Sequence, residues 1–290
     1  MIHYITCHFG TDELIDIQLK HIHNHTTGDY KVWMSYTTPS AHEADKYSRG
    51  NRPTWFNPVI IDNHEPIMGR NKAKCHHFEF IPITPVPLSN MFELSDFSRH
   101  RYVASLNHQN NLHILTERVL SDPYTNDTDT IIWMDNDTLL VDSVDQLVDV
   151  ENFIAAQRCH RQHANGTDSL HPHPLFASCK VGFWRSHNIN WRGGGFYKTS
   201  NNNKYKFNDT GGYLYAYFEH NNIPWDKIYK SGSIHDTSQE FFEIYGNSIL
   251  HLGSISLANT RRKCHDIYQR QSHIDMLSQV VTGKYINYKL

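Results

Sequence analysis

The stretch Ile131–Asp137, which reads IIWMDND, places two aspartates directly after a short apolar run. A continuous apolar run of this length is typical of a strand that is buried on both faces of a sheet. The run ends abruptly at Asp135, so both carboxylates are expected at the carboxyl end of that strand. In open α/β sheets, ligands bind outside this end of the strands. The stretch therefore predicts an α/β fold with a functional site at one edge of its sheet.

The spacing of the two aspartates suits a divalent cation. Carboxylates at positions i and i+2 bracket a turn, so Asp135 and Asp137 can both reach one ion, directly or through water. Mg²⁺ or Mn²⁺ held in this way commonly keeps open positions for phosphate oxygens. An ion there would also make a diphosphate a better leaving group. The alternative interpretation is a solvated acidic turn, which is common after a strand.

The residues on the amino side of this stretch predict a β-α-β opening. Strands are expected at 2–7 and 30–36, with a helix between Thr11 and Thr27 whose apolar residues recur at helical spacing. This order is typical of a parallel sheet. A further strand is expected at 78–83 and an amphipathic helix at 97–120.

The residues on the carboxyl side predict further elements that elaborate the sheet. A capping box at Ser143 indicates a short helix, and the late strand 244–250 precedes His251. Residues 153–157 are expected to form a strand, and a helix is expected to open after Asp209. The polar stretch 160–174 is interpreted as a loop. Histidine is abundant, at 22 of 290 residues, so the pairs His76-His77 and His171-Pro-His173 are interpreted as loop residues rather than ligands.

Composition and charge exclude several classes of protein. The formal net charge of −3 and the pI near 6.7 argue against a general nucleic-acid or membrane-surface binder. No stretch approaches the ~20 apolar residues of a spanning helix, and the amino-terminal residues do not resemble a signal peptide. Five scattered cysteines without a CxxC pair argue against a disulfide framework or a structural zinc site. We therefore expect a cytoplasmic protein without a transmembrane segment, in which sequons such as that at Asn136 are not read.

Three further segments, taken with the D-x-D motif, give the chain a family resemblance. Residues 104–107 (ASLN) look like an A-x-N stretch, residues 207–214 (FNDTGGYL) look like an acidic acceptor-side motif, and residues 249–253 (ILHLG) look like a late His-x-Gly. In this order, over most of residues 1–255, the chain resembles the nucleotide-sugar-dependent glycosyltransferases of the GT-A fold. In that family the D-x-D motif ends a central strand after a nucleotide-binding first half.

The resemblance implies one glycosyltransferase domain over residues 1–290, with a mixed, mainly parallel central sheet flanked by helices. Residues 1–137 would form the nucleotide-sugar-binding half and residues 138–290 the acceptor-side half. The implied donor is a nucleotide sugar, UDP- or GDP-linked, and the implied acceptor is a carbohydrate or another hydroxyl compound. Asp135, Asp137 and His251 would hold Mn²⁺ or Mg²⁺ on the donor diphosphate. A buried structural histidine is the alternative for His251.

The remaining site residues are also carried over from the resemblance. Asp209 is the first choice for a catalytic base, although it could equally be a helix cap, and the chain has Asp-Thr-Gly where well-known members have a Glu-Asp pair. Asp236 or Glu240 is the reserve. Four residues are expected to contact the donor, each with an ordinary structural role as the alternative: Thr6, His8, Asn107 and Arg262. Three tryptophans are interpreted as core residues, with stacking on sugar faces as the alternative: Trp184, Trp191 and Trp225.

Two other functions compete with this interpretation. The stretch 135–143 (DNDTLLVDS) resembles the D-x-D-G-T-L-V-D-S motif of haloacid-dehalogenase-type phosphohydrolases, whose first aspartate is a nucleophile. Here Thr138 and Leu139 depart from that motif, and no later acidic cluster of the expected form follows. The second competitor is a non-catalytic module that binds a glycan or a nucleotide. The three hypotheses differ in what is released from a nucleotide sugar: a nucleotide, inorganic phosphate or nothing.

Overall fold

The computed structural model describes eleven segments of the chain, which are residues 1–9, 12–37, 75–81, 96–148, 150–161, 168–187, 189–191, 196–198, 204–206, 210–236 and 239–252. The helices are α1 (Asp12–His25), α4 (Asp96–Ser121), α5 (Asp145–Val148), α6 (Val181–Ser186) and α7 (Gly212–Asn221). The strands are β1 (Ile2–Phe9), β2 (Tyr30–Thr37), β3 (Cys75–Ile81), β4 (Thr130–Asp135), β5 (Thr138–Leu140), β6 (Phe153–Arg161), β7 (Asp168–Lys180), β8 (Phe196–Lys198), β9 (Lys204–Lys206), β10 (Trp225–Ile228), β11 (Lys230–Asp236), β12 (Gln239–Tyr245) and β13 (Ile249–His251).

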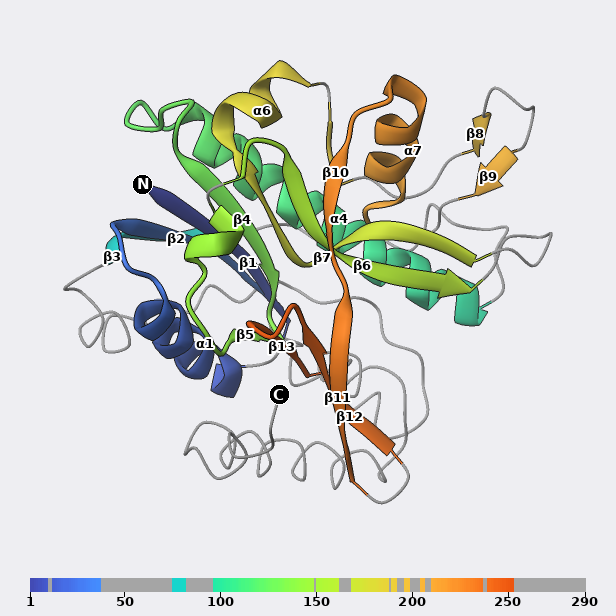
Figure 1. Ribbon diagram of the computed structural model, residues 1–290, viewed down its shortest axis with the longest axis horizontal. Helices are drawn as coiled ribbons and strands as arrows, with labels where there is room; N and C mark the ends of the chain where they lie inside the picture. Colours follow the sequence, from blue (N-terminus) through green and yellow to red (C-terminus); the bar gives the residue numbers. More distant parts are fainter. Residues whose placement is uncertain are drawn as a thin grey trace.

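Seven strands form a central sheet in the order β10-β6-β7-β4-β1-β2-β3 (Figure 1). Neighbouring strands run parallel except at β7, which is antiparallel to both β4 and β6. The sheet is therefore mixed and mainly parallel, and helices pack on both of its faces. This confirms the predicted α/β class. The boundaries of a single domain over residues 1–290 stay a prediction.

The alternation of side chains along β4 explains the two layers of the core. Ile131 and Trp133 point into one layer, and Ile132 and Met134 point into the other. The first layer holds the inner faces of α4, α6 and α7, and α4 passes behind the strands in Figure 1. The second layer holds α1, α5 and part of a smaller sheet. Because β4 is covered on both faces, apolar side chains fill the run from Ile131 to Met134, and all four are buried.

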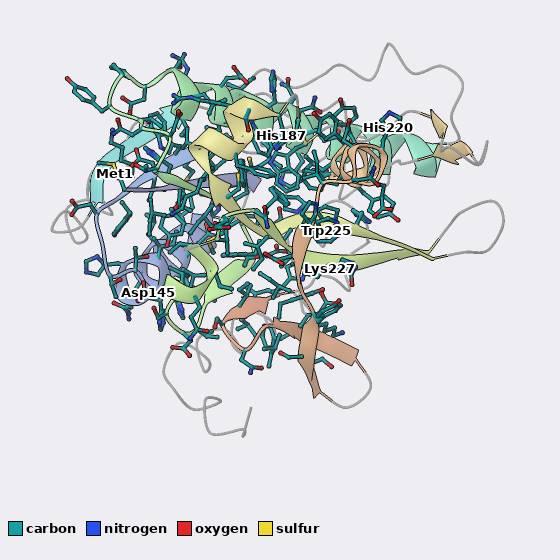
Figure 2. All side chains as sticks on the ribbon, turned by 45° about the horizontal axis from the view of Figure 1, so that its top comes forward. Met1, Asp145, His187, His220, Trp225 and Lys227 are labelled. Carbon is teal, nitrogen blue, oxygen red and sulfur yellow. The ribbon has the colours of Figure 1, made fainter. Side chains whose placement is uncertain are left out.

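The tryptophans considered for sugar stacking belong to the first layer. Trp184, Trp191 and Trp225 are 5%, 1% and 9% exposed, in one cluster with Trp133 and Phe153. The ring centroids of Trp184 and Trp191 lie 4.5 Å and 5.5 Å from that of Trp133. Trp225 lies on the edge strand β10 beside Lys227, whose ammonium is 5.4 Å from the indole centroid (Figure 2). These side chains are core residues, and the stacking alternative does not apply.

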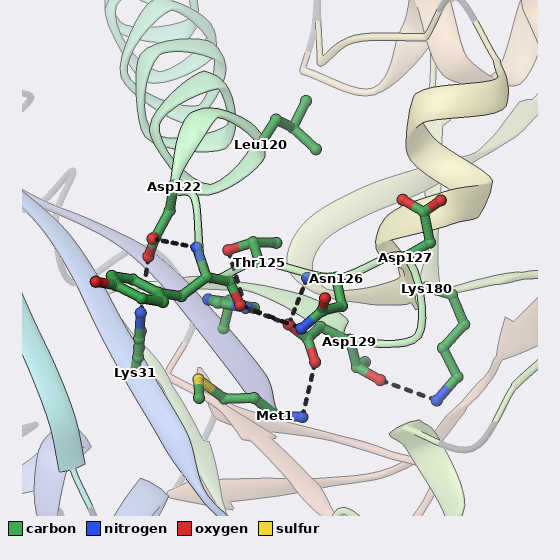
Figure 3. A network of polar contacts seen from close by, with 12 residues as sticks. Met1, Lys31, Leu120, Asp122, Thr125, Asn126, Asp127, Asp129 and Lys180 are labelled. Atoms are coloured by element: carbon green, nitrogen blue, oxygen red, sulfur yellow. Dashed lines mark hydrogen bonds and ion pairs between the residues drawn. The ribbon is translucent and has the colours of Figure 1, made fainter.

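A polar network fixes the amino ends of β1, β2 and β4 (Figure 3). Asp129 accepts hydrogen bonds from the Met1 ammonium at 2.9 Å and from the backbone N–H of Asn126 at 2.9 Å. Lys31 pairs with Asp122 at 2.7 Å. These contacts lie at the opposite end of the strands from Asp135.

A second sheet, in the order β11-β12-β13-β5, is antiparallel and lies beyond the end of the central sheet (Figure 1). The single strand expected at 244–250 is therefore wrong: the chain turns at Gly246-Asn247 between β12 and β13. Three residues, Gly246 to Ser248, connect the paired residues Tyr245 and Ile249. Gly246 and Asn247 have positive φ, 53° and 61°, which glycine and asparagine adopt more readily than other residues. The pair Gly246-Asn247 is a turn signal between two apolar stretches, and the interpretation of 244–250 as one strand overlooked it.

The loop expected at 160–174 is also wrong over most of its length. β6 continues to Arg161 and β7 begins at Asp168, so His171 and His173 lie on a strand, 1% and 6% exposed. Proline is tolerated in strands at bulges, and Pro174 falls within the register shift between β6 and β7. His76-His77 likewise lies on a strand, β3, rather than in a loop.

No helix in the described segments is both long enough and apolar enough to cross a bilayer.

Candidate metal centre

The strand pairing brings the three predicted ligands to one place. Asp135 is the last residue of β4, opposite Cys7 of β1, and a two-residue turn leads directly into β5. β5 pairs with β13 so that Thr138 lies opposite His251. The backbone N–H of Leu252 donates to the carbonyl of Asp137 at 2.8 Å. His251 thus comes beside the aspartates from more than a hundred residues further along the chain.

The side-chain geometry of Asp135, Asp137 and His251 suits a divalent cation. One ligand atom from each lies within 4.8 Å of the others. Two ligands at ~2.1 Å from one ion are at most ~4.2 Å apart, so a bound ion would draw these side chains slightly closer together. The Nε2 of His251 is 3.4 Å from the Oδ1 of Asp137. The three side chains are 14%, 4% and 3% exposed. Two enclosed carboxylates so close together repel each other, and a bound cation would remove that repulsion.

Gln18 of α1 holds the turn that carries the aspartates. Its amide nitrogen donates to the carbonyl oxygens of Asp135 at 2.7 Å and Thr138 at 2.9 Å, and the side chain is fully buried. Because the amide group donates there, its oxygen must accept, and it lies 2.9 Å from both Thr6 Oγ1 and His8 Nε2. The buried side chain of Gln18 on α1 therefore hydrogen-bonds both to β1 and to the two ends of the turn from Asp135 to Thr138, which carries the two aspartates.

Two further histidines lie close to the carboxylate of Asp135. His108 of α4 has its Nε2 3.1 Å from the Oδ1 of Asp135, and His173 of β7 has its Nδ1 3.8 Å from the Oδ2. The backbone N–H of Leu175 donates to that same Nδ1 at 3.1 Å. A nitrogen that accepts a hydrogen bond carries no hydrogen in the neutral ring, so the Nε2 of His173 is the protonated one. These rings extend the polar site across the sheet edge.

The Cys7 thiol, next to Asp135 across the β1–β4 pair, takes no part as a thiolate. Burial raises the pKa of Cys7 to about 12, so the thiol stays neutral at physiological pH.

The remaining predicted residues fall into two groups. Thr6 and His8 lie on β1, 1% and 0% exposed, with their side chains bonded to Gln18. The others lie outside the described residues, wholly or in their side chains. Asp209 and Arg262 are outside altogether, and the side chains of three residues on described elements are not described: Asn107 on α4, Asp236 on β11 and Glu240 on β12. Their roles stay predictions.

Four residues of the site were not found by sequence reasoning: Gln18, His108, His173 and Glu243. Gln18 had a signal, because it interrupts the apolar face that Ile15, Leu19 and Ile22 form on α1. A buried polar residue on such a face has to bond to something. The others become neighbours of the metal ligands only through strand and helix packing across the molecule.

Comparisons with known proteins add little. No protein-family model matches the chain, and no curated protein matches it. Solved structures of the galactosyltransferase LgtC are similar at 15% identity, covering 65% of this chain and 60% of theirs. The TM-score is 0.37 for LgtC in complex with donor and acceptor sugar analogues and 0.35 for an active-site mutant. Likeness at this level establishes neither a family nor an activity.

Proposed function

We propose that this protein is a metal-dependent glycosyltransferase that moves a sugar from a nucleotide-sugar donor to a hydroxyl acceptor. One observation carries the proposal. Asp135 and Asp137, at the carboxyl edge of a central parallel strand, lie within 4.8 Å of His251 in a site that suits a divalent cation. An ion at this edge faces the region where α/β sheets bind ligands, and its open positions suit a diphosphate.

The chemistry follows from the residues. Asp135, Asp137 and His251 hold Mn²⁺ or Mg²⁺, which when bound stabilises the negative charge that develops on the departing diphosphate. Gln18 keeps the two aspartates in register with each other through their shared turn. Asp209 takes the proton of the acceptor hydroxyl if the reaction inverts the anomeric centre. The preferred donors are UDP- and GDP-sugars, and the preferred acceptor is a carbohydrate.

A donor screen tests this proposal. The protein, in Mn²⁺ or Mg²⁺, is incubated with each common nucleotide sugar, with and without a panel of glycan acceptors. We expect release of nucleoside diphosphate from one donor, increased by one class of acceptor and abolished by excess chelator. Release of inorganic phosphate would favour the phosphohydrolase instead, and saturable binding of nucleotide or glycan without turnover would favour the binding module. Full turnover in chelator would contradict the metal assignment.

A further inference from the structure

The strand beside His251 carries a carboxylate that contacts the imidazole. β12 and β13 pair so that Glu243 lies opposite His251, and His251 in turn lies opposite Thr138. Residues directly opposite on adjacent antiparallel strands project from the same face. The Nδ1 of His251 is 2.9 Å from the Oε2 of Glu243. Glu243, His251 and Thr138 therefore lie side by side across the second sheet, and Thr138 ends the turn that carries the two aspartates.

The hydrogen bond between Glu243 and His251 determines which imidazole nitrogen carries the hydrogen and which has a free lone pair. An ionised carboxylate only accepts hydrogen bonds, so Nδ1 carries the hydrogen. The other nitrogen, Nε2, is then unprotonated in the neutral ring, and it is the atom 3.4 Å from Asp137. Metal-ligating histidines almost always donate their second N–H to a carboxylate, a carbonyl or water, which fixes the tautomer and raises the basicity of the ligand.

Glu243 is itself held by two neighbours. The hydroxyl of Tyr245 donates to Oε2 at 3.2 Å, and the ammonium of Lys230 is 3.4 Å from Oε1. Tyr245 is two residues along the same strand, and Lys230 is opposite Tyr245 on β11, so all three project from one face of the sheet. The positive charge of Lys230 favours the ionised form of Glu243, which is the form that accepts from His251.

We propose that Glu243 is a positioning residue of the metal centre: it fixes the Nδ1–H tautomer of His251 and so makes Nε2 available to a divalent cation. This inference rests on the proposed metal site. Loss of such a partner typically lowers metal affinity ~10–100-fold. We expect a loss in this range for Glu243→Gln, whose amide carries no charge and can donate as well as accept.

The test is a Mn²⁺ titration of the full chain at fixed pH, without nucleotide, followed by the electron paramagnetic resonance signal of free Mn²⁺. The variants are Glu243→Gln, Tyr245→Phe and Asp137→Asn, with Glu219→Gln, on the exposed face of α7, as the matched control. We expect wild-type affinity in the control, no saturable binding in Asp137→Asn, and a ~10–100-fold loss in Glu243→Gln. Tyr245→Phe should lose less, in the same direction, and it carries the test if Glu243→Gln fails to fold.

The outcomes separate this inference from the proposed function. Wild-type Mn²⁺ affinity in folded Glu243→Gln, together with lost binding in Asp137→Asn, would overturn the role of Glu243 and leave the metal site intact. Absence of saturable Mn²⁺ binding in the wild-type protein would overturn both. A fall in the unfolding midpoint of metal-free Glu243→Gln with unchanged Mn²⁺ affinity would make Glu243 a structural residue, which also overturns the inference.

Discussion

Asp137 is enclosed by its neighbours, at 4% side-chain exposure, and faces another carboxylate and an imidazole. Asp137→Asn keeps its shape but removes the charge that an ion would neutralise. A ligand at 100 times its Kd stabilises the folded state by about 2.7 kcal/mol. We expect Mn²⁺ at that concentration to give this gain in the wild-type protein and none in Asp137→Asn, by urea unfolding. The exposed Asp226→Asn on β10 is the control and should respond to Mn²⁺ as the wild type does.

Replacing Gln18 should lower both the free energy of unfolding and the affinity for Mn²⁺. Gln18→Met conserves most of the volume but leaves the carbonyls of Asp135 and Thr138 without their donor. Each buried group left unsatisfied costs about 1–3 kcal/mol, so the free energy of unfolding should fall by about 2 kcal/mol or more. Mn²⁺ affinity should fall as well, because the turn is no longer held. Gln146→Met on the exposed face of α5 is the matched control; equal effects of the two substitutions would contradict the role of Gln18.

The role of Asp209 is tested by its effect on the chemical step. Asp209→Asn preserves shape, and the N-cap of α7 is Gly211 rather than Asp209, so stability should change by about 1 kcal/mol or less. If a general base is lost, kcat should fall roughly 100-fold or more, while nucleotide affinity in the presence of Mn²⁺ should barely change. Steady-state kinetics and a nucleotide titration separate the two effects. A variant that transfers sugar at near the parent rate would exclude Asp209 as the base and move the search to Asp236 or Glu240.

How far the site could be predicted differs from residue to residue. Asp135 and Asp137 follow from local pattern, since two acids at the end of a buried strand fall on the sheet edge where ligands bind. His251 came from a resemblance, and the structure brings it beside them. Glu243 was not found, because its place depends on the register of a hairpin whose turn, at Gly246-Asn247, was not recognised. In a hairpin the turn fixes which residues lie opposite each other, so Glu243 is placed opposite His251 only once that turn is recognised.

At the scale of elements, the β12–β13 hairpin sets the position of both Glu243 and His251. Gly246 in its turn has φ 53°, and a Cβ there would come 2.7 Å from the Cγ2 of Ile228. Gly246→Ala should lower the free energy of unfolding by about 1–2 kcal/mol, the cost of left-handed backbone for a residue with a Cβ. Since the strained turn carries the site, Mn²⁺ affinity should also fall. Asn247→Gly, at a φ that suits glycine, is the control and should change stability little.

The elements that the sequence predicted well share one property. β1, α1, β2 and α4 have apolar residues at the spacing of a strand or a helix, with capping or turn residues at their ends. β7 does not: His171 and His173 are buried polar residues, and two prolines lie among them. Composition alone makes such a stretch resemble a loop. Its burial comes from being placed between β4 and β6, which is a property of the sheet rather than of the segment.

At the scale of the whole molecule, the strand order shows why the class was predictable and the topology was not. The β-α-β opening implies parallel neighbours β1 and β2, and the apolar run implies a central β4. Nothing local indicates that β7 returns antiparallel beside β4, or that four short strands assemble a second sheet at the end of the first. That second sheet delivers His251, so the site depends on the least predictable part of the fold.

Three histidines, His3 buried on β1 and His21 and His25 partly buried on α1, predict how the stability of the fold depends on pH. Burial lowers the pKa of His3, His21 and His25 below the usual 6.5. In the unfolded chain these groups take up protons near pH 6.5, while in the folded chain they do so only at lower pH, so the unfolded state binds more protons in between. Stability is therefore fully present above pH 6.5 and is lost as the pH falls below it. Urea unfolding of the metal-free protein at pH 7.5 and at pH about 5.5 measures the loss.

A single substitution tests whether these histidines cause the loss. The Nδ1 of His21 donates to the carbonyl of Leu140 at 2.5 Å, and the amide of His21→Gln can donate there without ever taking up a proton. The unfolding free energy of His21→Gln should therefore fall less between the two pH values than that of the wild-type protein. His113→Gln, whose parent side chain is 42% exposed on α4, should follow the wild type. A lowered histidine pKa acts on folding only through proton uptake by the unfolded chain. If the wild-type protein gains stability on acidification, or if His21→Gln keeps the wild-type pH dependence, then burial of these rings does not govern the pH response.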